Sequence, residues 1–78
     1  MSKQTITIYE NGVWAGNGDL LFSPNNGGQY FVSNCAAELG SNSAESDAAY
    51  EAIDAAINAG EKAASVDGYE WTWEIEDA

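Results

Sequence analysis

The stretch GYEWTWEIED spans residues 68–77 and places a large apolar side chain at every second position. Tyr69, Trp71, Trp73 and Ile75 fall on one side of an extended chain, whereas most of the carboxylates fall on the other. This alternation is typical of a strand in a sheet that has one buried face and one solvent-exposed face. The sequence therefore predicts a β-strand whose aromatic side packs on another element.

A helix suited to cover that aromatic side is predicted at residues 44–59. Asn42 or Ser43 fits the N-cap position, and Glu45 completes a capping box if Asn42 is the cap. Gly60 follows the helix as a favourable C′ residue. Small and aliphatic side chains share one stripe of this helix: Ala49, Ala52, Ile53, Ala56 and Ile57, with Tyr50 at the margin. The alanines permit a close approach to a sheet.

The N-terminal segment has the pattern of a β-hairpin. Residues 4–9 (QTITIY) alternate and are β-branched or aromatic, which predicts a strand. Asn11 and Gly12 both accept positive φ angles, so they predict a tight hairpin turn. Residues 13–15 then begin the returning strand.

Five further segments complete the predicted outline. Residues 16–19 (GNGD) form either a second turn or a bulged stretch, and residues 23–28 form a loop. Residues 29–33 predict a strand, residues 34–39 predict one or two helical turns, and residues 64–66 predict a short strand.

Together these segments predict an α+β fold, with an antiparallel sheet of three or four strands and one main helix (about 44–59) packed on one face. The expected order is β-β-β-α-β.

Residues 1–78 show no internal repeat or linker, which favours a single domain. No apolar run approaches the roughly 20 residues of a membrane span, and no secretory signal is visible. We therefore expect a soluble cytoplasmic protein.

Charge is the strongest compositional signal. Thirteen acidic residues face two lysines, Lys3 and Lys62, for a net charge of −11. Ten of the acidic residues lie in residues 45–78. Such a field repels nucleic acid and anionic membranes and attracts cationic surfaces. The expected partner is a basic nucleic-acid-binding protein, with neither direct nucleic-acid binding nor membrane binding.

The acidic side chains predict two rows on regular elements. Asp47, Glu51 and Asp54 share one arc of the predicted helix, opposite the apolar stripe, and Asn58 continues it. The final strand also carries carboxylates on its solvent-exposed side. Two acidic rows on adjacent elements are therefore expected to resemble the charged edge of a DNA duplex. The candidate partner-binding residues are Glu45, Asp47, Glu51, Asp54, Glu70, Glu74, Glu76 and Asp77.

The composition argues against an enzyme. There is no histidine, and Cys35 is the single cysteine, which excludes imidazole-based triads and Cys/His zinc sites. Paired carboxylates remain possible, but a chain of 78 residues leaves little room for a substrate cleft. No catalytic residue, cofactor or metal is expected, and Cys35 is expected to be a small buried hydrophobe. Tyr9 and Trp14 fit core packing better than interface anchoring.

In size, charge and pattern the chain resembles the small acidic anti-CRISPR proteins of phages that act as DNA mimics. The residues that support this resemblance are Asp47, Glu51, Asp54, Glu70, Glu74, Glu76 and Asp77. The resemblance implies a stoichiometric inhibitor in the host bacterial cell, bound to a CRISPR surveillance complex. It would occupy the surface of a type I Cascade that reads the protospacer-adjacent motif and would block target DNA.

Three other classes stay open. An acidic immunity protein or antitoxin would neutralise a cationic nuclease by the same electrostatics. A calcium-binding module would use Asn/Gly-rich turns, but residues 16–19 contain one carboxylate and show no EF-hand spacing. A small acidic domain with another partner would use its charge for solubility.

Overall fold

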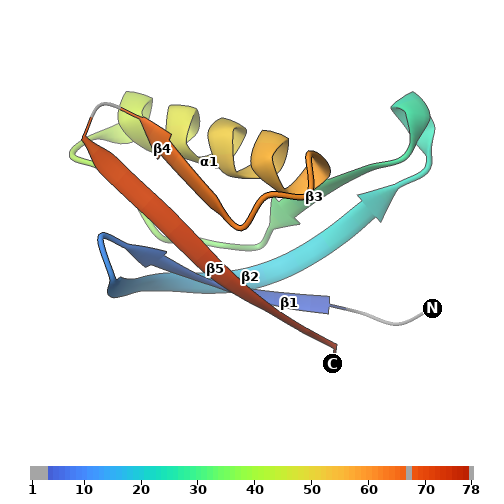
Figure 1. Ribbon diagram of the computed structural model, residues 1–78, viewed down its shortest axis with the longest axis horizontal. Coiled ribbons are helices and arrows are strands. Elements are labelled where there is room, and N and C mark those ends of the chain that lie inside the picture. The colour runs from blue at the N-terminus through green and yellow to red at the C-terminus, as the bar shows by residue number, and fades with distance from the viewer. Residues whose placement is uncertain (1–3, 67, 78) are drawn as a thin grey trace.

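The structure is a computed structural model that describes residues 4–66 and 68–77. Within these residues it has five strands and one α-helix: β1 (Gln4–Glu10), β2 (Val13–Ser23), β3 (Gln29–Ser33), α1 (Ser43–Asn58), β4 (Ala63–Val66) and β5 (Tyr69–Asp77). A 3-10 turn at Asn25–Gly27 lies between β2 and β3. The strands form one antiparallel sheet in the order β3-β2-β1-β5-β4 (Figure 1).

The predicted α+β class is confirmed, but the strand count is five rather than three or four. The short segment before the last strand is a full partner of β5, with Ala64 opposite Trp71 and Val66 opposite Tyr69. The element order is therefore β-β-β-α-β-β, one strand longer than predicted.

The predicted hairpin between β1 and β2 is confirmed. Asn11 (φ 50°) and Gly12 (φ 83°) both adopt positive φ, which matches the twist of a two-residue hairpin. Residues 16–19 are not a second turn, since β2 continues through them. A register shift occurs opposite Ile8 and Tyr9, just before this stretch, and leaves Ala15 as the extra residue of a β-bulge.

Glycines in β2 allow the chain after β3 to pack directly on the strand. A Cβ atom added at Gly18 would lie 2.7 Å from the Ser33 carbonyl oxygen and 2.8 Å from Cys35 Cβ, and one at Gly16 would collide with Ala37. Residues 34–39 are irregular rather than helical, so the predicted helical turns are wrong. The extended path over the glycines ends with Leu39 fully buried in the core.

Tyr50 on α1 fixes this irregular segment. Its hydroxyl donates to the Ala37 carbonyl at 2.7 Å and approaches Cys35 Sγ at 3.1 Å. Burial of the hydroxyl, followed by its contact with Cys35, raises the pKa of Tyr50 above its ordinary value of 10.0. Cys35 packs against the core but is half-buried, so it is less buried than predicted.

The helix begins and ends as the sequence predicts, within one residue. Asn42 is the N-cap, and its Oδ1 accepts from the backbone N–H of Glu45 at 2.9 Å. At the other end Gly60 has φ 80°, its N–H bonds to Ile57, and the following N–H bonds to Ala56. This pair of bonds is a Schellman motif, which satisfies carbonyls that the helix leaves unpaired.

The aromatic strand face packs under the helix, as predicted. Trp71 is 1% exposed and belongs to one core cluster with Ile6, Ile8, Leu20, Leu39, Ala49 and Ile53. Tyr69 and Trp73 pack against this cluster from the same strand. Ile75 is 40% exposed, because the C-terminal part of β5 runs past the helix (Figure 1).

The sheet curves around α1. The helix packs mainly against β3 and β4, which are the two outermost strands of the sheet. The side chains of Ile6, Ile8 and Trp71 fill the space beneath it. The other face of the sheet is covered by no described element, and we call it the open face.

Candidate functional site: acidic surfaces and sheet edges

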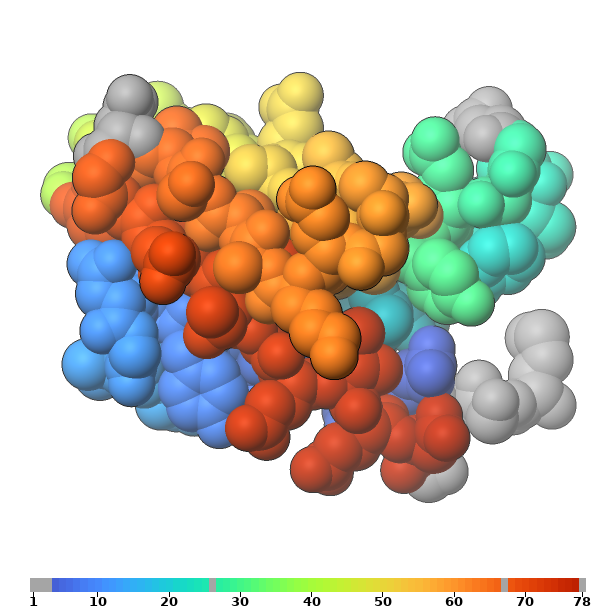
Figure 2. Space-filling view, in the orientation of Figure 1, coloured from blue at the N-terminus to red at the C-terminus, as the bar shows by residue number. Residues whose placement is uncertain are grey.

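The carboxylates of β5 line the open face. Trp71 points toward the helix, so Glu70, Glu74 and Glu76 point to the opposite side, and all three are exposed. Residues two apart on a strand are separated by roughly 6.6 Å. The strand half of the predicted acidic surface is therefore an exposed line of side chains on a paired strand. Figure 2 shows the C-terminal part of β5 at the molecular surface, away from α1.

Asp19 joins this line from β2. Thr5 is paired with Asp19 on one side and with Glu76 on the other, so both carboxylates flank Thr5 on the open face. Two strand spacings separate them, about 10 Å. The Asn34 side chain donates to Asp19 at 2.7 Å. Asp19 was not among the residues predicted from the sequence, because only the register of β1 with both neighbours brings it near β5.

We call Asp19, Glu70, Glu74 and Glu76 the open-face acidic row. Asp77, at the end of β5, follows the opposite alternation and accepts a 3.2 Å hydrogen bond from the Gln4 side chain. Its side chain is therefore on the opposite face of the sheet from the row.

The helical carboxylates do not join the open-face acidic row. Asp47 and Glu51 are exposed on α1, whose apolar stripe faces the sheet. The open face lies on the far side of that sheet, so the two predicted rows are on different sides of the molecule. The prediction of two acidic rows side by side is therefore wrong. Because the apolar stripe of the helix packs against the aromatic face of the strand, the polar sides of the two elements point in opposite directions.

Asp54 has a structural contact. Its Oδ1 accepts from the backbone N–H of Val32 on β3 at 3.0 Å, and its side chain is half-buried. Burial raises the pKa of the Asp54 carboxyl above its ordinary value of 3.8, while the hydrogen bond from Val32 opposes that rise. The helical arc predicted that Asp54 is exposed together with Asp47 and Glu51. This prediction is wrong, because Asp54 is half-buried against β3.

Asn58 continues the contact along the same strand. Its side-chain oxygen accepts from the Tyr30 N–H at 2.8 Å, and its amide donates to the Tyr30 carbonyl at 2.9 Å. Asp54 and Asn58 together bond three outward backbone groups of β3, the N–H and C=O of Tyr30 and the N–H of Val32, as a neighbouring strand would.

Glu45 serves the helix cap. Its Oε1 accepts from the Ser41 N–H at 2.7 Å, and its own N–H bonds to Asn42. Of the eight predicted partner-binding residues, Glu45, Asp54 and Asp77 therefore have internal hydrogen-bond partners. Asp47, Glu51, Glu70, Glu74 and Glu76 are exposed without such a partner among the described residues.

Positive charge is sparse on the described surface. Lys62 is exposed between α1 and β4 and forms no ion pair with a described carboxylate. Within residues 4–66 and 68–77, no lysine forms an ion pair with Glu70, Glu74 or Glu76.

Two aromatic side chains border the same face. Tyr9 is paired with Trp14 across β1 and β2, and Trp14 is 60% exposed. The expectation of core packing is wrong for Trp14, because the bulge at the hairpin leaves it on the open face, where no described element packs. Tyr9 is half-buried beside it.

The predicted alternatives can be compared with the geometry. Within the part of the chain that the structure describes, no group of three or more His, Cys, Asp or Glu side chains is arranged to hold a metal ion. Residues 16–19 lie inside β2 and do not form a loop. No described helix is long and apolar enough to span a membrane.

Comparisons with protein-family models, curated proteins and solved structures give no match for this chain. Its function must therefore be inferred from the residues and their geometry.

Proposed function

We propose that this protein is a stoichiometric inhibitor that mimics DNA and occupies the DNA-binding surface of a cationic protein. The observation that supports this most strongly is the open-face acidic row, which contains Glu70, Glu74 and Glu76 on a single paired strand. Because the backbone of the paired strand is already ordered, binding restricts only the glutamate side chains, so more of their attraction to lysine and arginine remains as affinity.

The spacing supports mimicry of one DNA strand at reduced charge density. Glu70 to Glu76 covers roughly 20 Å at about 3.3 Å per residue and presents three carboxylates. One DNA strand carries about six phosphates over that length. Asp19 adds a fourth carboxylate about 10 Å to the side, which widens the charged area.

The target that we propose is the subunit of a type I Cascade that recognises the protospacer-adjacent motif, with the protein acting as a phage anti-CRISPR. Such a subunit must hold a DNA duplex in a basic groove. An anionic protein that fills the groove excludes DNA by simple competition and needs no catalytic residue.

The test measures binding of a labelled target duplex to purified Cascade while this protein is added. We expect the wild type to displace DNA, and to do so less well as salt rises. The variant Glu70→Gln/Glu74→Gln/Glu76→Gln removes three charges from the open face. Its inhibition should weaken by about 10-fold or more, since each lost charge removes a contact to a cationic side chain.

A matched variant separates the position of the charges from their number. Glu38→Gln/Asp47→Asn/Glu51→Gln removes three charges at exposed positions elsewhere. It should inhibit nearly as well as the wild type, and circular dichroism should show both variants folded. Equal inhibition by the two triple variants would contradict the proposal. If Cascade is unaffected and a cationic nuclease is neutralised instead, the protein is an immunity protein or antitoxin.

A further inference from the structure

The hydrogen bonds of Glu70 fix the direction of every backbone group in β5. Its N–H bonds to the Asn11 side chain at 2.9 Å, and its carbonyl accepts from the Asn11 N–H at 2.8 Å. Both groups of Glu70 therefore point toward the β1 side. Because backbone groups alternate along an antiparallel strand, those of Tyr69 and Trp71 point toward β4.

This alternation identifies the free groups of β4. Ala64 and Val66 are the residues opposite Trp71 and Tyr69, so they exchange hydrogen bonds with β5. Ala63 and Ser65 consequently direct their N–H and C=O groups away from the sheet. No described residue forms a hydrogen bond with these groups.

The two edges of the sheet therefore differ. On β3 the corresponding outward groups of Tyr30 and Val32 are bonded by side chains of α1. On β4 the helix offers alanines, which have no hydrogen-bonding side chain. Exposed strand edges are templates for pairing with another chain unless they are blocked. One edge of this sheet is closed and the other is open.

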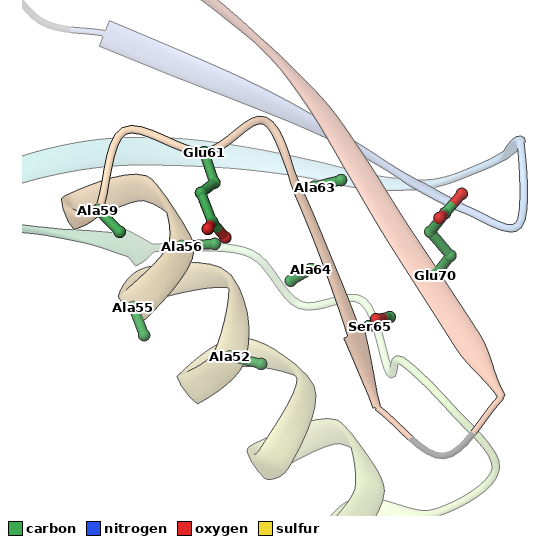
Figure 3. Close-up of a pocket in the computed structure, with 9 residues that line it drawn as sticks. All are labelled: Ala52, Ala55, Ala56, Ala59, Glu61, Ala63, Ala64, Ser65 and Glu70. Atoms are coloured by element: carbon green, nitrogen blue, oxygen red, sulfur yellow. The ribbon is translucent and has the colours of Figure 1, made fainter.

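A groove runs along the open edge, between β4 and α1 (Figure 3). Its volume is about 540 Å³. Ala52, Ala55 and Ala59 line it from the helix, and Ala63 and Ser65 line it from the strand. The small side chains leave room beside β4 for the side chains of an added strand.

The negative charge around the groove favours a cationic occupant. Glu61 and Glu70 line it together with the alanines, and Figure 3 shows Glu61 extending toward Ala56. Lys62 is the only described lysine near it, and the whole chain has a net charge of −11. A second copy of this chain would bring the same negative charge to the edge, whereas a cationic segment would be attracted.

We propose that the open edge of β4 binds an extended cationic segment of a partner protein by β-strand addition. The segment pairs antiparallel with Ala63 and Ser65 through backbone hydrogen bonds. Successive side chains of the segment point to opposite faces of the sheet. Those on the helix side are small and apolar and face the alanines of α1, and those on the open-face side are basic and lie near Glu70. This contact shares only Glu70 with the open-face acidic row and does not depend on DNA mimicry.

The test uses an acetylated and amidated octapeptide of alternating lysine and valine. In the proposed pairing the lysines lie opposite Ala63 and Ser65, so their N–H groups face β4. The control peptide carries a methyl group on the backbone nitrogen of each of its four lysines. This change keeps the side-chain charge but removes the backbone N–H donors that face β4. Isothermal calorimetry should show binding of the first peptide and an affinity weaker by about 10-fold or more for the second.

A pair of protein variants tests the same contact from the other side. Ser65→Pro removes one outward N–H, and proline is tolerated at an edge position whose N–H faces solvent. This variant should bind the peptide more weakly than the wild type. Ser65→Ala keeps the N–H and should bind the peptide as the wild type does. Amide exchange measured by NMR should show the N–H groups of Ala63 and Ser65 protected only when the unmethylated peptide is present.

Three results would overturn the proposal. The first is equal affinity for both peptides, which would indicate attraction by charge alone. The second is unchanged exchange at Ala63 and Ser65 when peptide is bound. The third is protection of these amides without peptide together with a dimer in analytical ultracentrifugation, which would identify a second copy as the occupant. None of these results decides the Cascade experiment, which shares only Glu70 with this contact and also depends on Glu74 and Glu76.

Discussion

The Oδ1 atom of Asp54 accepts a 3.0 Å hydrogen bond from the backbone N–H of Val32, so a helix side chain closes one edge of the sheet. Asn58, one turn later on α1, bonds both backbone groups of Tyr30. These contacts give two residues of the predicted acidic arc a structural role. They also explain why β3 is closed to pairing while β4 is open.

Replacing Asp54 should separate its hydrogen bond from its charge. Asp54→Asn keeps an acceptor for Val32 and removes the cost of burying a carboxylate, so at neutral pH it should be at least as stable as the wild type. Asp54→Ala leaves the Val32 N–H without its acceptor and should lose about 1 kcal/mol of unfolding free energy. Urea denaturation of the three proteins measures both effects.

The pH dependence of these variants follows from the raised pKa of Asp54. A group whose pKa is higher in the folded state contributes stability below its ordinary value of 3.8, and this contribution is lost as pH rises through the folded pKa. The advantage of Asp54→Asn over the wild type should therefore shrink as pH falls toward about 3. Asp47→Asn, at an exposed position, is the control. An advantage that stays constant from neutral to acid pH would contradict this.

Glu10 should be important for stability despite its charge. Its Oε1 accepts from Trp71 Nε1 at 2.9 Å and from the Gly40 N–H at 2.8 Å. Glu10→Ala leaves both donors without this acceptor, so we expect a loss of about 2 kcal/mol. Glu10→Gln keeps an acceptor and should lose less. Equilibrium unfolding followed by tryptophan fluorescence distinguishes them, and equal losses would show that the acceptor is unimportant.

Gly18 is predicted to tolerate no side chain. A Cβ there would meet the carbonyl of Ser33, the last residue of β3, and Cys35, which belongs to the segment that packs on β2. Gly18→Ala should cost about 1–3 kcal/mol, because the backbone must move to make room. Asn17→Ala, one residue away and exposed, should change stability by less than about 0.5 kcal/mol. A stable Gly18→Ala protein with an unchanged fold would show that the segment is loosely packed.

Salt should affect folding and binding in opposite directions. With a net charge of −11 and Lys62 unpaired among the described residues, repulsion between carboxylates dominates the surface. Screening should therefore raise the melting temperature between low ionic strength and about 0.15 M salt. Binding to a cationic partner should weaken over the same range. A melting temperature that falls with added salt would indicate that attractive pairs dominate instead.

Local signals were enough to predict most of the elements. The Asn11-Gly12 turn, the strand at residues 29–33 and the Asn42 and Gly60 caps depend on residues adjacent in sequence, so their patterns are visible without the fold. The aromatic alternation around Trp71 likewise predicted which side of β5 is buried.

Contacts between distant residues could not be predicted in this way. Gly18 was predicted to lie in a second turn or a bulged stretch, but its absent side chain makes room for the chain that follows β3. Asp54 looked like one more surface charge, yet the path of β3 brings a backbone donor to it.

The sequence by itself determined the charge, the amphipathic helix and the alternating strands, because these are properties of composition and short-range periodicity. The tertiary structure alone decided which carboxylates gather: the sheet register places Asp19 near Glu76, and the packing of α1 on the sheet separates Asp47 from Glu74. It also decided which edge is open, because the position of the helix gives β3 two hydrogen-bonding side chains and gives β4 alanines.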